Sequence, residues 1–99
     1  MARIHLISVD RTFAKRLSDA MGENVSVEMI HTLDDATFDG PGLIVLDHAS
    51  IPADRMLSSV LGEVAQLAQG RAIVVATADW FAGTVLQAIR SGASDVLPR

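Results

Sequence analysis

The strongest constraint on the fold of this chain comes from three short, almost continuous aliphatic runs, "RIHLISV" (3–9), "GLIVL" (42–46) and "RAIVVAT" (71–77). Runs of Ile, Val and Leu of this length are typical of strands that are buried on both faces, as in a parallel sheet. A weaker run at 25–30 alternates between apolar and polar residues and predicts a strand nearer an edge. A last strand is expected at 94–98, where a proline ends it.

Between these runs the apolar residues recur with the period of a helix. Residues 11–22 repeat apolar side chains at every fourth position, with Asp10 as the expected N-cap and Gly22 as the stop. Residues 52–70 begin with a proline, end with a glycine and predict a longer amphipathic helix. The apolar face of that helix would contain Met56, Leu57, Val60, Leu61, Val64 and Leu67.

A third helix is predicted over 79–92, with Asp79 as its cap and a glycine at its end. Its inward-facing residues are expected to be Val85, Leu86 and Ile89. The segment 31–42 gives a weaker pattern, with room for a short helix over 33–38 before a Gly-Pro-Gly loop.

Strands that alternate with helices predict one α/β domain over residues 1–99, with right-handed crossovers, a parallel sheet and helices on both faces. The first strand is followed by "SVDRTF" in place of G-x-G-x-x-G, so a dinucleotide-binding site ranks last among the functions considered. No helix follows the fifth strand. Either a partner covers the aliphatic face left by that helix, or the chain is a fragment of a longer protein.

The composition narrows the function classes. Hydrophobic residues make up 49% and aromatic residues 4%, so the core must be aliphatic. Cysteine is absent, which excludes disulfides and thiolate metal sites. A net charge of −4 gives no basic footprint for nucleic acid. No apolar run approaches the roughly 20 residues of a membrane span, and the start lacks a signal peptide. We therefore expect a cytoplasmic domain.

Three landmarks now fall together: a strand that ends in Asp47, a later strand that ends in Thr77, and the phrase "AIRSGASDVLPR" over 88–99. With them the chain resembles the receiver domain of bacterial response regulators over nearly its whole length, lacking only the last helix of that family. The resemblance implies a doubly wound, flavodoxin-like sheet of five parallel strands in the order 2-1-3-4-5. It also implies protein partners in two-component signalling, and a domain that is not an independent enzyme.

The resemblance further implies roles for individual residues. In receivers an aspartate after the third strand accepts a phosphoryl group, a hydroxyl after the fourth strand bonds a phosphoryl oxygen, and a lysine after the fifth adds positive charge. These positions match Asp47, Thr77 and Arg99. Arginine keeps the charge of lysine but presents a planar fork in place of a compact ammonium group.

A receiver also holds Mg²⁺ between the acceptor and a pair of acidic residues that follow the first strand. Aligned without gaps, Ser8 and Val9 occupy the positions of that pair, and Asp10 lies just past it. A shift of two residues brings Asp10 to the first acidic position, but Arg11 then follows at the second. Either alignment removes at least one carboxylate, and the reduced metal site would consist of Asp10 and Asp47.

Local roles compete with these assignments. Asp47 could cap the loop after its strand, Thr77 could bond nearby backbone, and Arg99 could be solvated at the end of the chain. The three histidines, His5, His31 and His48, are scattered over different elements and predict no metal site. Trp80 and Phe81 are expected to be packing or interface residues.

Two functions follow. The first is an atypical receiver, without phosphorylation or cofactor, that acts as a protein-interaction or dimerisation module. The altered acidic pair, Arg99, and Val96 in place of the family's aromatic residue all favour it. Its closing phrase is similar to that of receivers in Tad-type pilus-assembly ATPases, which suggests partners in pilus assembly or localisation. The alternative is a working phosphoacceptor in which Asp10 and Asp47 share Mg²⁺.

Association is expected in either case, because the missing helix leaves apolar side chains uncovered. The predicted homodimer uses the region of strands four and five, through Val85, Leu86, Ile89, Val96 and Leu97.

Overall fold

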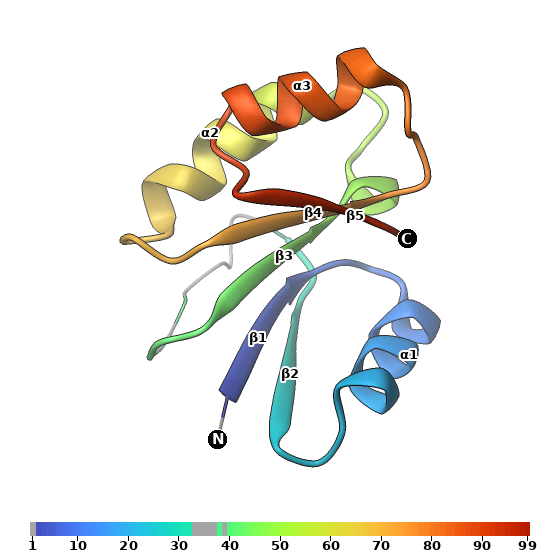
Figure 1. Ribbon diagram of the computed structural model, residues 1–99, viewed down its shortest axis with the longest axis vertical. Helices are drawn as coiled ribbons and strands as arrows, with labels where there is room; N and C mark the ends of the chain where they lie inside the picture. Colours follow the sequence, from blue (N-terminus) through green and yellow to red (C-terminus); the bar gives the residue numbers. More distant parts are fainter. Residues whose placement is uncertain (1, 33–37, 39) are drawn as a thin grey trace.

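The computed structural model of the chain describes residues 2–32, 38 and 40–99. Five parallel strands form one sheet in the order β2-β1-β3-β4-β5, as predicted, with helices on both faces (Figure 1). The elements are β1 (Ala2–Ile7), α1 (Arg11–Met21), β2 (Val25–Ile30), β3 (Leu43–Asp47), a 3₁₀ turn η1 (His48–Ser50), α2 (Leu57–Leu67), β4 (Ile73–Thr77), α3 (Ala82–Arg90) and β5 (Asp95–Pro98).

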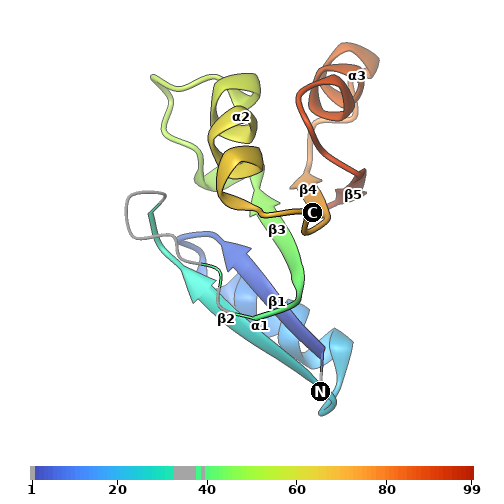
Figure 2. The ribbon, with the colours of Figure 1, turned by 90° about the vertical axis from the view of Figure 1, so that its left-hand side faces the viewer.

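The two faces of the sheet carry separate parts of the core. Helix α1 lies on one side, and α2 and α3 lie together on the other (Figure 2). Because side chains alternate along a strand, neighbouring residues enter different clusters. On β3, Val45 packs on the α1 side with Phe13, whereas Leu46 packs on the other side with Leu61 of α2. This alternation decides which polar side chains at the strand ends can meet.

Helix α1 has the predicted boundaries. Asp10 accepts a hydrogen bond from the Phe13 N–H, and Gly22 ends the helix with a φ of 82°. Helix α2 begins at Leu57, five residues later than the pattern from Pro52 predicted. Residues 52–56 form turns, and the helix starts at the first residue of the apolar stripe that is buried.

Helix α3 also begins later than predicted, and it presents a different face to the core. Asp79 does not occupy the N-cap position, although its carboxylate accepts bonds from the Phe81 N–H and the Thr84 hydroxyl. The expectation that Leu86 and Ile89 point inward is wrong, because their exposed fractions are 53% and 44%. The buried position is Ala88, with Val85 partly buried three positions earlier. Successive residues of a helix are about 100° apart around its axis. Leu86 and Ile89, each one position after an inward-facing residue, therefore point away from the core.

Only part of the aliphatic surface expected near β5 is exposed. Val96 is buried on the side of α2 and α3, and Leu97 is 47% exposed. Trp80 and Phe81 are exposed in the loop before α3. The short helix expected over 33–38 lies outside the described residues, except for Phe38, which is buried. None of the described helices is long and apolar enough to cross a membrane.

Two leucines test these burial assignments. Leu61 of α2 is fully buried, so Leu61→Ala should lower the free energy of unfolding by roughly 2–5 kcal/mol. Leu86→Ala on the outer face of α3 should change it by no more than about 0.5 kcal/mol. Urea denaturation measures both values. A larger loss for Leu86→Ala than for Leu61→Ala would contradict the orientation of α3.

Candidate functional site

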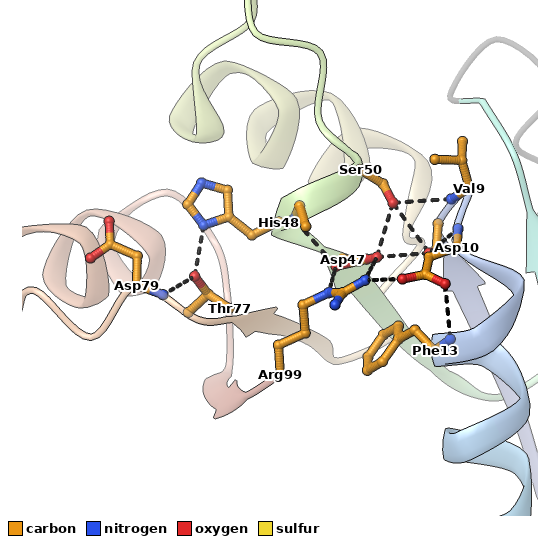
Figure 3. A network of polar contacts seen from close by, with 11 residues as sticks. Val9, Asp10, Phe13, Asp47, His48, Ser50, Thr77, Asp79 and Arg99 are labelled. Carbon is orange, nitrogen blue, oxygen red and sulfur yellow. Dashed lines mark hydrogen bonds and ion pairs between the residues drawn. The ribbon is translucent and has the colours of Figure 1, made fainter.

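The polar residues selected from the sequence gather at the carboxyl ends of the strands. In a parallel sheet these ends lie at one edge, so residues far apart in the chain meet there. Ser8 follows β1, Asp47 ends β3, Thr77 ends β4 and Arg99 follows β5. Figure 3 shows Asp47 at the centre of one set of contacts and Thr77 in another.

Asp47 has no exposed surface and accepts five hydrogen bonds. Its Oδ1 accepts from Arg99 Nε at 2.7 Å and from the Ala49 N–H at 3.2 Å. Its Oδ2 accepts from the hydroxyls of Ser8 at 2.7 Å and Ser50 at 2.9 Å, and from a terminal nitrogen of Arg99 at 3.2 Å. A carboxylate offers about four lone-pair positions, so those of Asp47 are filled. The bond from Ala49 also caps η1, which confirms the local role considered for Asp47.

The guanidinium of Arg99 is held on several sides. The terminal nitrogen that contacts Asp47 also donates to Asp10 Oδ2 at 2.6 Å. The guanidinium carbon lies 4.7 Å from the centroid of the Phe13 ring, within cation–π range. The Arg99 N–H donates to the Thr77 carbonyl at 3.0 Å, which fixes the backbone from which this side chain extends. Its side chain is only 18% exposed, so the alternative of a solvated Arg99 is wrong.

This pairing sets the protonation states. Burial alone would raise the pKa of Asp47, but hydrogen bonds from Arg99, Ser8 and Ser50 outweigh it and hold that pKa below its usual value. The hydrogen bond from Arg99 and the N–H of Phe13 likewise lower the pKa of Asp10. Asp47 and Asp10 in turn raise the pKa of Arg99 above its ordinary value. The site is therefore two carboxylates bridged by one permanent cation.

Thr77 does not join this group. Its hydroxyl accepts a bond from the Asp79 N–H at 2.9 Å and lies 2.7 Å from His48 Nδ1. Residues two apart on a strand point to the same face of the sheet. Thr77 therefore points with Val75 to the side of α2, whereas Asp47 points with Val45 to the side of α1. The local backbone bond confirms the role considered for Thr77. Of the predicted site residues, the structure brings together Asp47, Arg99 and Asp10.

These residues do not fit a magnesium ion. The two carboxylates of the reduced metal site already share the guanidinium of Arg99, and Asp10 Oδ1 caps α1. Mg²⁺ demands oxygen ligands in near-octahedral geometry. Across residues 2–32, 38 and 40–99, no three His, Cys, Asp or Glu side chains form a group that could hold a metal.

Sequence reasoning missed two contributors. Ser50, three residues after Asp47, donates to the carboxylate and also accepts from the Val9 N–H at 3.0 Å. Phe13, one of the apolar side chains repeated over 11–22, packs in the core, and its ring also faces Arg99. A hydroxyl close after a buried aspartate is a signal that could have indicated Ser50. The contact of Phe13 with Arg99 depends on tertiary structure and leaves no pattern in the sequence.

Searches against protein-family models and curated protein sequences found no match. Solved structures do match. A two-component response regulator from Clostridium difficile has a TM-score of 0.77 at 19% identity, over 100% of this chain and 84% of that one. A Burkholderia pseudomallei response regulator with a phosphorylated aspartic acid and a calcium ion has a TM-score of 0.77 at 20% identity, over 100% of this chain and 60% of that one.

A third similar structure is the pilus assembly protein CpaE from Burkholderia thailandensis, with a TM-score of 0.73 at 22% identity, over 99% of this chain and 85% of that one. At these identities the likeness concerns the fold. This chain has the fold of response-regulator receiver domains, as its sequence predicted.

Arg99→Gln tests the ion pair. The substitution leaves the buried Asp47 carboxylate with its hydroxyl and backbone donors but without a cation. We expect a loss of about 3 kcal/mol of unfolding free energy, the low end of the range for breaking a buried pair, because those donors remain. Urea denaturation at pH 7 measures it. Arg90→Gln, at an exposed arginine of α3, is the control, and an equal effect of the two would contradict the pairing.

The same pair predicts a pH dependence. Because the folded pKa of Asp47 lies below the unfolded value of about 4, its stabilising contribution is present above pH 4. That contribution is lost as the pH falls through the folded pKa. In Arg99→Gln, burial is no longer opposed by a cation, so the pKa of Asp47 should rise and stability should begin to fall at a higher pH. Denaturation curves between pH 3 and 7 give the comparison, and an unchanged profile would contradict it.

Proposed function

We propose that this receiver-fold domain acts as a protein-interaction module and that Asp47 is not phosphorylated. The observation that carries the proposal is the two-point contact of the Arg99 guanidinium with both oxygens of Asp47. A phosphoacceptor needs one carboxylate oxygen with an available lone pair and a cation that offsets the incoming charge. Here the lone pairs are filled and the cation belongs to the protein.

The residues around Asp47 support the same proposal. Ser8, at the first position of the receiver acidic pair, donates its hydroxyl hydrogen to Asp47. A carboxylate in its place would repel Asp47, whereas the hydroxyl stabilises the ionised form. The proposed module binds proteins through its surface and needs neither catalysis nor a metal cofactor. The location we propose for it is the cytoplasm.

The surface we assign to this role is the outer face of α3, formed by Leu86 and Ile89, which are 53% and 44% exposed. Exposed apolar side chains grouped on one helix are a common feature of interaction sites. A homodimer through this face is the simplest arrangement. The similarity to CpaE supports a partner in pilus assembly or localisation, in line with the closing phrase of the sequence.

Phosphoryl donors test the proposal. With acetyl phosphate or beryllofluoride and millimolar Mg²⁺, the amide signals of Asp47 and its neighbours should not shift in ¹⁵N–¹H NMR spectra. A receiver that has the complete acidic pair serves as the positive control. Saturable, magnesium-dependent shifts at Asp47 that disappear in Asp47→Asn would instead establish the alternative, a working phosphoacceptor.

The surface has its own test. Leu86→Glu places a charge on the outer face of α3 and should raise the dissociation constant of the dimer at least about tenfold. Sedimentation of the chain over a range of concentrations measures this change as a shift from dimer to monomer. Leu67→Glu on α2, where the leucine is 41% exposed, is the matched control and should leave the dimer intact. A monomer at all concentrations, or equal effects of both substitutions, would contradict a dimer through α3.

A further inference from the structure

A cavity of about 360 Å³ lies next to the Asp47 site. Its inner wall is apolar and comes from three elements, with Ile7 at the end of β1, Leu46 on β3 and Val60 on α2, all buried. Its outer rim includes Val9, which is 59% exposed, and Pro52 in the turns before α2. The volume is within the range of roughly 300–1,000 Å³ that small-molecule sites occupy.

The position of the cavity follows from the topology. Strands β1 and β3 are neighbours in the sheet. The chain leaves β1 toward α1 on one face and leaves β3 toward α2 on the other (Figure 2). Where consecutive connections diverge to opposite faces, a crevice opens beyond the carboxyl ends of the strands, and doubly wound sheets bind their ligands there.

The charges on the wall are compensated. In the described part of the chain, Asp47 and Arg55 are the acidic and basic residues that line the cavity, beside the imidazole of His31. Asp47 is paired with Arg99, and Arg55 contacts Glu63 at 2.6 Å. An ionic ligand would have to compete with these partners while losing its own hydration in a mostly apolar site. The cavity therefore favours an uncharged molecule.

Ser50 adds one directional contact. It lines the cavity and is partly exposed. Its hydroxyl donates to Asp47 and accepts from the Val9 N–H, so its hydrogen and one of its two lone pairs are used. Its oxygen also lies 3.2 Å from the Ser8 hydroxyl oxygen, but the one hydrogen of Ser8 is directed at Asp47 and leaves the second lone pair of Ser50 without a donor. The remaining lone pair can accept a hydrogen bond but the hydroxyl cannot donate another. A complementary ligand carries a donor.

We propose that this cavity is a binding site for a neutral, mostly apolar small molecule of one or two rings that carries a single N–H or O–H donor. The donor bonds Ser50, and the ring packs against Ile7, Leu46 and Val60. The inference depends on the Asp47–Arg99 pair and not on the absence of phosphorylation. A ligand titration detects binding in the cavity, whereas the phosphoryl-donor experiment detects a change at Asp47. Either experiment can therefore fail while the other succeeds.

Three probes of similar size test the proposal on the full chain: indole, 1-methylindole, which lacks the donor, and benzoate, which is an anion. In ¹⁵N–¹H NMR titrations indole should shift the amide signals of Ile7, Val9 and Ile51 saturably. We expect 1-methylindole and benzoate to bind at least about fivefold more weakly, the effect of about 1 kcal/mol for one hydrogen bond or one unfavourable charge.

A matched pair of variants locates the binding. Val9→Trp fills the rim at an exposed position and should abolish the shifts, whereas Leu86→Trp on the outer face of α3 should retain them. Dispersed amide spectra of both variants establish that each is folded. Three outcomes would overturn the proposal: no saturable shift with indole, binding of benzoate or 1-methylindole as tight as that of indole, or shifts that persist in Val9→Trp.

Discussion

A carboxylate that is fully buried must be paired, and the pairing of Asp47 by Arg99 organises one edge of this fold. The fork of Arg99 reaches across 52 residues of sequence to Asp47 and across 89 to Asp10. It thereby ties the ends of β3 and β5 to the start of α1. The ring of Phe13 covers the guanidinium, and the hydroxyls of Ser8 and Ser50 both donate to Asp47.

The fold could be predicted because its signals are local. Aliphatic runs of strand length, separated by segments of helical period, admit few arrangements other than a parallel sheet. The edge position of 25–30 and the cap at Asp10 were equally local and are confirmed. The start of α2 and the inner face of α3 were not, because each depends on which apolar residue finds a partner. Ala88, whose small side chain does not stand out in the apolar pattern, is the buried residue of α3.

The site was only half predictable for a similar reason. That Asp47 and Arg99 would share an edge follows from parallel strands. Whether Arg99 contacts the carboxylate directly depends on the space that Ser8 leaves and on the ring of Phe13. Thr77 shows the opposite case: its position at the end of β4 suggested a partner for Asp47, but the alternation of the strand directs its hydroxyl to His48 and Asp79. The departures from the receiver pattern meet at one place: the Ser8 hydroxyl donates to Asp47, and the Arg99 guanidinium contacts both Asp47 and Asp10.

The distance in sequence between Arg99 and its partners has a consequence for how the molecule forms. Closing a contact across 89 residues costs loop-closure entropy that grows with the logarithm of the loop length, and contacts so distant in sequence slow folding. During synthesis, β1 to β4 emerge before Arg99, and their association brings a carboxylate toward an apolar interior with no cation beside it. Docking of β5 supplies that cation. The ion pair therefore makes the last strand a condition for burying the third, which couples the two halves of the sheet into one cooperative unit.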